Sequence, residues 1–121
     1  MKININGHEL ELHYSLRILI NYEELTGKSL DFADLTSVSN LIKLYYAAVI
    51  ASLQYARMPL DVTWEDFLDF VDEDGEKGLM DFGNWYAKSM SAQSDVEKNK
   101  KANKDTNKKE KKSDLKLEKN V

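Results

Sequence analysis

The chain has 121 residues, with 17 Lys and Arg against 21 Asp and Glu, a net charge of −4 and no cysteine. This length gives room for one small domain, and the lack of cysteine excludes a disulfide framework and any Cys-ligated zinc or iron–sulfur site. Residues 95–121 carry ten Lys and six acidic residues (+4), whereas residues 1–94 carry seven Lys and Arg and fifteen acidic residues (−8). We expect a folded domain over residues 1–94 and a lysine-rich, disordered tail over residues 95–121, since the tail has too few apolar side chains to offset its chain entropy.

The first predicted element is a β-hairpin. Residues 2–5 and 8–12 alternate between apolar and polar side chains on either side of Asn6-Gly7, a pair that tolerates positive φ at both corners of a type I′ turn. A two-residue turn fixes the register and places Ile5 opposite His8. One face of such a hairpin is apolar, so it must pack on the rest of the chain.

Helical periodicity and capping residues predict four helices after the hairpin, over residues 16–26, 38–57, 64–71 and 79–91. Ser15, Ser37 and Thr63 stand where helices begin, and Gly27 stands where the first one ends. The second helix is apolar on every side in its middle, which marks it as the centre of the core. The predicted fold class is therefore α+β, mainly α: an N-terminal hairpin packed on about four helices, followed by the tail.

No segment predicts a membrane span or an export signal. The longest apolar run, residues 44–51, is much shorter than the roughly 18–20 residues that a bilayer requires. The N-terminus alternates instead of forming the continuous apolar stretch of a signal peptide. We expect a soluble, cytoplasmic protein with no membrane partner.

Residues that carry catalysis are scarce. His8 and His13 fall on opposite faces of one strand and cannot chelate a metal there, and Gly27-Lys28-Ser29 lacks the earlier glycine of a phosphate-binding loop. The acidic stretch at residues 72–75 lacks the first ligand of a calcium-binding loop. We expect no enzyme activity, no cofactor and no metal. An enzyme would require a deep cleft that gathers His8 or His13 with carboxylates.

The lysine-rich tail is not typical of a nucleic-acid binder. Acidic residues interrupt its lysines, it holds no arginine or aromatic residue, and it adjoins an acidic domain. We expect a solvated arm and no nucleic-acid partner. Weak attraction of the tail to the acidic domain is an alternative that the sequence leaves open.

Aromatic side chains give the strongest indication of a binding function. Helices this short cannot bury all of them, and exposed rings form patches that bind protein partners. We expect a groove between the second and fourth helices to receive an amphipathic partner helix. The predicted partner-binding residues are Tyr45, Tyr46, Tyr55, Trp85 and Tyr86.

The segment Leu-Arg-Ile-Leu-Ile-Asn-Tyr-Glu-Glu-Leu-Thr-Gly-Lys-Ser-Leu, residues 16–30, resembles a known family. It is similar to the helix ending in Glu-Glu-x-Thr-Gly-Lys-Ser in tail assembly chaperones of long-tailed phages and prophages. In these proteins a long apolar helix and then a Thr-x-Glu-Asp/Glu-hydrophobic helix start follow, and residues 63–67 (Thr-Trp-Glu-Asp-Phe) look like that start. The resemblance covers about residues 1–90 and lies in the order and spacing of these motifs.

The resemblance implies a non-enzymatic helper that binds the tape-measure protein, keeps its hydrophobic helices soluble and recruits tail-tube subunits. It would act in the cytoplasm of the bacterial host and would not be part of the mature virion. Many members are made in two lengths by a programmed frameshift, so the lysine-rich end is either the variable tail or near that junction. No binding residue carries over, and self-association, a longer frameshifted form and the role of the tail stay open.

A second hypothesis comes from the charge alone. A small acidic regulatory module could occupy a DNA-binding protein by mimicking the charge of nucleic acid. One acidic face would favour this alternative, whereas an exposed apolar patch would favour the chaperone. The residues that would form the acidic face are Asp66, Asp69, Asp72, Asp74 and Asp81.

Overall fold

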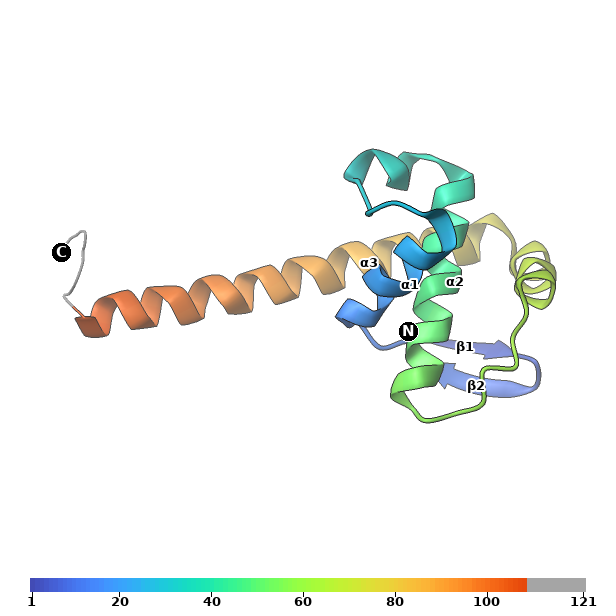
Figure 1. Ribbon diagram of the computed structural model, residues 1–121, viewed down its shortest axis with the longest axis horizontal. Helices are drawn as coiled ribbons and strands as arrows, with labels where there is room; N and C mark the ends of the chain where they lie inside the picture. The colour runs from blue at the N-terminus through green and yellow to red at the C-terminus, as the bar shows by residue number, and fades with distance from the viewer. Residues whose placement is uncertain (109–121) are drawn as a thin grey trace. The chain divides into compact units, whose positions relative to one another are not determined.

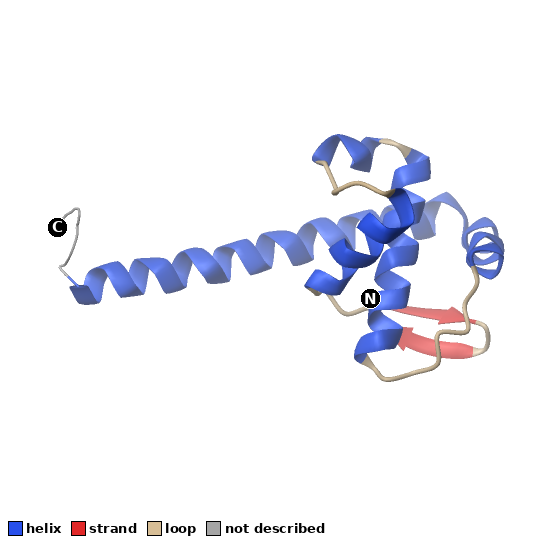
Figure 2. Ribbon diagram, in the orientation of Figure 1, coloured by secondary structure: helices blue, strands red, loops and turns tan. Residues whose placement is uncertain are grey.

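The computed structural model describes the backbone of residues 1–108 and the side chains of residues 1–92, apart from that of residue 32. It is mostly helical, with a two-stranded antiparallel hairpin at the N-terminus (Figures 1 and 2), which confirms the predicted fold class. The chain divides into a compact unit, Met1–Ala87, and a second unit that begins at Lys88. The elements are β1 (Lys2–Ile5), β2 (His8–Glu11), α1 (Leu16–Thr26), the 3₁₀ helix η1 (Phe32–Thr36), α2 (Val38–Tyr55) and α3 (Trp64–Lys108).

The hairpin has the predicted register, with Ile5 opposite His8. Asn6 and Gly7 take φ values of 51° and 78°, as the tight turn requires. The Asn6 side-chain amide donates a hydrogen bond to the Asp61 carbonyl oxygen at 3.2 Å, which holds the turn against the segment before α3. The apolar face of the hairpin is buried and consists of Ile3, Ile5, Leu10 and Leu12.

Helix α1 has the predicted bounds. It ends at Gly27, whose left-handed φ of 78° lets its N–H donate to the Glu23 carbonyl at 2.7 Å. Ile18 and Tyr22 form its fully buried face. Helix α2 begins after the Ser37 cap, as predicted, and ends at Tyr55, slightly before the predicted end.

Helix α3 begins with a reciprocal cap. The Asp66 N–H donates to the Thr63 hydroxyl at 3.1 Å, and the Thr63 N–H donates to the Asp66 carboxylate at 3.4 Å. The predicted break over residues 72–78 is confined to Gly75, with φ 79° and ψ −174°. Beyond Gly75 the helical backbone continues to Lys108, so residues 95–108 of the predicted tail are helical here, while residues 109–121 lie outside the described part.

The core centres on the Tyr45 ring of α2. Phe82, from the part of α3 after Gly75, stacks on it with centroids 4.3 Å apart and planes 7° from parallel. Phe67, from the part before Gly75, meets it edge-on at 5.1 Å. The bend at Gly75 therefore lets both parts of α3 pack against one ring.

Candidate partner-binding surface

The structure does not gather the five predicted partner-binding residues on one surface. Tyr45 and Tyr86 are buried in the core, and this burial removes them from the surface that we expected. Tyr46 and Trp85 are half-buried, and only Tyr55 is exposed. Tyr45 and Tyr86 therefore offer no exposed ring to a partner, whereas Tyr46, Tyr55 and Trp85 keep exposed surface.

The ionisation of the buried phenols follows from their positions. Loss of solvent raises the pKa of Tyr86 to about 12, and nearby Tyr14 adds to the shift. Burial likewise raises the pKa of Tyr45, with smaller contributions from Asp74 and Asp81. Both rings stay neutral at physiological pH, as befits core residues.

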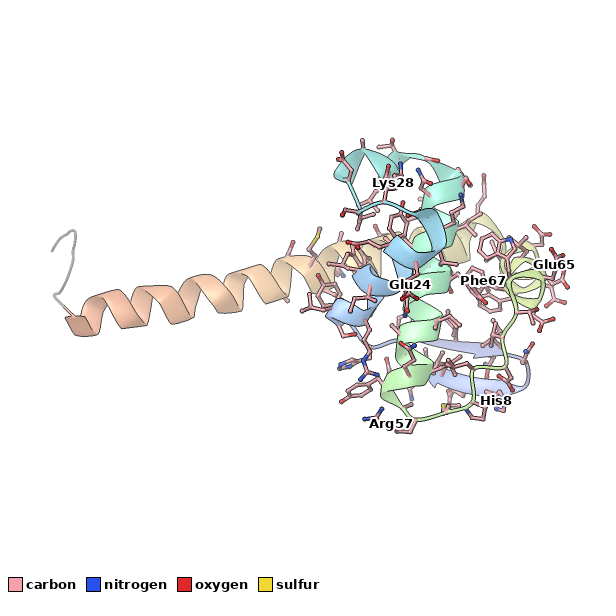
Figure 3. The ribbon with its side chains drawn as sticks, viewed as in Figure 1. His8, Glu24, Lys28, Arg57, Glu65 and Phe67 are labelled. Carbon is pink, nitrogen blue, oxygen red and sulfur yellow. The ribbon has the colours of Figure 1, made fainter. Side chains whose placement is uncertain are left out.

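A groove lies elsewhere, between α1 and the end of α2. Its volume is about 490 Å³. Figure 3 labels Glu24 on α1 and Arg57 just beyond α2, two of the residues that line it. We call it the α1–α2 groove, and its lining consists of Arg17, Ile20, Asn21, Glu24, Gln54, Arg57, Met58 and Leu60.

Several large apolar side chains in and beside this groove are exposed to solvent. Ile20 is 56% exposed and Leu60 is 55% exposed, although both are large aliphatic residues. Leu16, one helical turn before Ile20 on the same side of α1, is 76% exposed. Exposed aliphatic side chains that adjoin a recess are typical of a surface that another molecule covers.

The floor of the groove joins the two helices through side-chain amides. The Asn21 amide donates to the Gln54 side-chain oxygen at 3.3 Å and to the Ala47 carbonyl at 3.4 Å. These bonds fix α1 against α2, and the groove is lined by α1, by Gln54 of α2 and by the segment that follows α2.

The end of α2 positions the far wall. The Met58 N–H donates to the Leu53 carbonyl at 2.9 Å and the Arg57 N–H donates to the Gln54 carbonyl at 3.2 Å. This is the Schellman pattern, and it requires a left-handed residue, here Arg57 with φ 59°. The turn directs the chain back so that Met58 and Leu60 line the groove beside α1.

The groove also collects positive charge. Arg17 and Arg57 are the only arginines of the sequence. Among the side chains that the structure describes, no carboxylate lies within 4.0 Å of either guanidinium. Two cations without ion-pair partners, against the single carboxylate of Glu24, make the groove net positive on an acidic domain.

The segment that resembles the chaperone motif has a structural explanation. The Thr26 hydroxyl donates to the Tyr22 carbonyl at 2.8 Å and accepts from the Lys28 N–H at 3.3 Å. The Ser29 hydroxyl donates to the Glu23 carboxylate at 3.2 Å. Thr-Gly-Lys-Ser therefore ends α1 and turns the chain, and its polar side chains are used locally.

Asp34 anchors the same turn from η1. Its carboxylate accepts from the Asp31 N–H at 3.1 Å and from the Tyr22 hydroxyl at 3.2 Å, and Lys28 Nζ lies 3.4 Å away. The hydrogen bond from the Asp31 backbone, more than the charge of Lys28, holds the pKa of Asp34 below its usual range despite burial. This cluster fixes the η1 turn to α1.

The two histidines have different neighbours. His8 Nε2 is 3.5 Å from an Asp61 carboxylate oxygen, and His13 stacks on Tyr55 with centroids 3.6 Å apart. Within residues 1–92, no three His, Asp or Glu side chains are grouped so that they could hold a metal ion. No helix in the described part of the chain is both long and apolar enough to cross a membrane.

Some of the acidic residues do converge near the hairpin turn. Asp66 and Asp69 line one recess with Glu73, and Asp74 lines a recess that Glu73 shares. Asp81, by contrast, pairs with Lys77 at 3.0 Å. The predicted single acidic face is thus gathered only in part.

Comparison of the chain with protein-family models, with curated proteins and with solved structures gave no match.

Proposed function

We propose that this protein is a non-enzymatic tail assembly chaperone of a long-tailed phage or prophage. It would bind the tape-measure protein, help to recruit tail-tube subunits, and act in the bacterial cytoplasm without entering the mature virion. The proposal rests on the resemblance over about residues 1–90 and on a binding surface suited to a hydrophobic client.

The observation that carries the proposal is the exposure of Ile20 and Leu60 in the α1–α2 groove. Burying such side chains against a partner releases roughly 25 cal/mol for each Å² of apolar surface, whereas leaving them in water gains nothing. A protein that shields apolar segments needs a folded surface of this kind and a charged remainder. The acidic domain of this chain supplies both.

A helical client fits the groove better than an extended one. Side chains of two helices form most of the lining, so there is no sheet edge to which a strand could add. A helix satisfies its own backbone hydrogen bonds and needs only side-chain contacts. An amphipathic helix can therefore occupy the groove without leaving polar backbone groups unpaired.

Coexpression with the tape-measure protein of a long-tailed phage or prophage that carries this gene tests the proposal. We expect the full chain to keep that protein in the supernatant and to copurify with it. The variant Ile20→Ser/Leu60→Ser should lose both effects. The control variant Val38→Ser/Met80→Ser removes two apolar side chains elsewhere that are somewhat more exposed, and it should keep both effects.

Precipitation of the tape-measure protein in the presence of the wild-type chain, with no complex detected, would reject the proposal. Equal behaviour of the two double variants would instead leave a chaperone that does not use this groove. Circular dichroism of each variant shows that the fold is retained.

The acidic recess beside the hairpin turn favours a second candidate. Asp69, Glu73 and Asp74 line the recesses there, and a module that mimics nucleic-acid charge would present such side chains to a basic protein. In that case, Asp69→Asn/Glu73→Gln/Asp74→Asn would abolish partner binding, whereas Ile20→Ser/Leu60→Ser would not.

A further inference from the structure

The two arginines of the chain meet in the groove from different parts of the sequence. Arg17 comes from the first turns of α1, and Arg57 comes from the turn after α2. Every other basic residue is a lysine, and the domain over residues 1–94 carries a net charge of −8. The groove is therefore a positively charged region on a negatively charged domain.

Arginine differs from lysine in a way that matters at a binding surface. The guanidinium is planar, offers two parallel N–H donors to a carboxylate and holds its water weakly, so it is readily desolvated at an interface. Arginine is enriched in the cores of protein interfaces, and lysine is depleted there. Two arginines beside exposed aliphatic side chains thus indicate a partner that is both apolar and acidic.

The backbone at Arg57 supports this assignment. Its φ of 59° lies in the left-handed region, where glycine fits without strain and arginine does not. The Schellman turn alone would favour glycine at this position. Arginine therefore carries a backbone cost that its role in the α2 turn does not explain.

We propose that the α1–α2 groove recognises an amphipathic helix that carries Asp or Glu beside its apolar face. The apolar anchors of that helix would contact Ile20, Met58 and Leu60, and its carboxylates would pair with Arg17 and Arg57. This inference deepens the proposed function, on which it rests for its biological setting, by stating the chemistry of the client segment.

Charge decides against other occupants. The lysine-rich residues 95–121 of the same chain would be repelled by Arg17 and Arg57. Nucleic acid would offer phosphates to the two arginines but no aliphatic surface to Ile20 and Leu60, and its dense negative charge would be opposed by the acidic domain. An acidic amphipathic helix supplies both the carboxylates that would pair with the arginines and the apolar face that would cover the aliphatic side chains of the groove.

Selection from a display library of randomised helical peptides of about 18 residues, roughly five turns, tests the inference. The bait is the full chain. We expect enriched peptides with apolar residues at i, i+3 or i+4 and i+7, flanked by Asp or Glu. The bait Arg17→Glu/Arg57→Glu should enrich peptides flanked by Lys or Arg instead.

One enriched peptide then serves as the probe in fluorescence anisotropy. We expect roughly tenfold weaker binding to Arg17→Glu/Arg57→Glu, because two attractive charge pairs become repulsive. The variant Lys43→Glu/Lys77→Glu has the same change in net charge outside the groove and should bind within about twofold of the wild type. Replacing the Asp and Glu residues of the peptide with Asn and Gln should weaken its binding to the wild type in the same way.

Three results would overturn the inference: no enrichment, enrichment without acidic residues, or equal weakening by the two double variants. None of these depends on a tape-measure protein. If that protein is held in coexpression but the peptides show no acidic preference, the chaperone proposal survives and the client chemistry fails. If acidic peptides bind but the tape-measure protein does not, the preference of the groove for acidic helices stands and the chaperone proposal fails.

Discussion

Tyr45 and Tyr46 are neighbours in α2, yet only one of their hydroxyls has a hydrogen-bond partner. The Tyr46 hydroxyl donates to the Val62 carbonyl oxygen at 2.7 Å and ties α2 to the segment before α3. The Tyr45 hydroxyl is fully buried and has no partner among the described residues. Tyr46 therefore contributes a hydrogen bond through its hydroxyl, whereas Tyr45 contributes the packing of its ring.

Phenylalanine at these two positions should therefore have opposite effects. Tyr46→Phe leaves the Val62 carbonyl without its donor and should lower the free energy of unfolding by about 1 kcal/mol. Tyr45→Phe removes an unsatisfied buried hydroxyl and should leave that free energy unchanged or raise it by up to about 1 kcal/mol. Urea denaturation of the two variants measures both values, and equal losses would show that the Tyr45 hydroxyl does have a hydrogen-bond partner.

The bend in α3 predicts a contrast between two glycines of the same helix. Gly75, with φ 79° and ψ −174°, lies in a region that essentially only glycine occupies, so Gly75→Ala should cost about 1–3 kcal/mol. Gly83 is helical, and an added Cβ would lie 4.0 Å from the nearest Leu41 methyl carbon. Gly83→Ala should be neutral or stabilising by roughly 0.5–1 kcal/mol. Thermal unfolding of both variants checks this, and a Gly75→Ala variant as stable as wild type would contradict the bend.

Acid should destabilise the fold partly through Asp34. Its folded pKa is lowered, mainly because it accepts the Asp31 N–H, so the unfolded state takes up a proton at higher pH than the folded state. The stabilisation is present in full above the ordinary carboxyl pKa of about 4 and is lost as the pH falls through it toward the folded value. We expect the free energy of unfolding, measured with urea, to fall less between about pH 7 and pH 3 for Asp34→Asn than for the wild type.

The stability of the Asp34→Asn variant should still depend on pH. Glu11 and Asp66 also have lowered pKa values, because each carboxylate accepts hydrogen bonds in the folded state. Because of these two residues, the free energy of unfolding of the variant should still fall as the pH is lowered. If the free energy of unfolding of the variant falls with pH as steeply as that of the wild type, the cluster around Asp34 contributes nothing to the pH dependence of stability.

Arg57 should show a conflict between stability and binding. Arg57→Gly relieves the left-handed backbone and should raise the free energy of unfolding by roughly 1 kcal/mol, while it weakens the binding of an acidic helical peptide. Arg57→Lys keeps the backbone cost and the charge but loses the paired donors, so stability should stay unchanged and binding should fall modestly. Urea denaturation and peptide anisotropy on the same samples separate the two effects. A Gly variant that is less stable than wild type would contradict the strain at Arg57.

The fold could be predicted in most of its parts because its signals are local. Asn6-Gly7 determined the turn and the register of the hairpin, and Gly27 determined the end of α1. The break before the last helix was predicted too broadly, because a single glycine at residue 75 is enough to bend α3. The bounds of α3 beyond residue 91 were not anticipated from the charged composition there.

The binding surface was harder to predict, because it depends on packing between distant segments. Phe67 contacts both Tyr45 and Tyr46, whereas Phe82 stacks on the buried Tyr45 from a distant part of the chain, a contact that no local pattern reveals. The return of Leu60 to the side of α1 depends on the turn at Arg57. One signal was present in the sequence: Leu16 and Ile20 stand on the polar side of α1, at a spacing of one turn.

Photo-cross-linking in bacterial cells that also produce the proposed tape-measure client is the direct test of the α1–α2 groove as a binding surface. A photoreactive side chain in place of Ile20 or Leu60 reports what covers the α1–α2 groove, and the same group in place of Val38 or Met80 reports what covers two exposed apolar positions outside it. The account predicts an adduct with the tape-measure protein, identified by mass spectrometry, from Ile20 and Leu60 only. Adducts with that protein from Val38 or Met80, and none from Ile20 or Leu60, would contradict it.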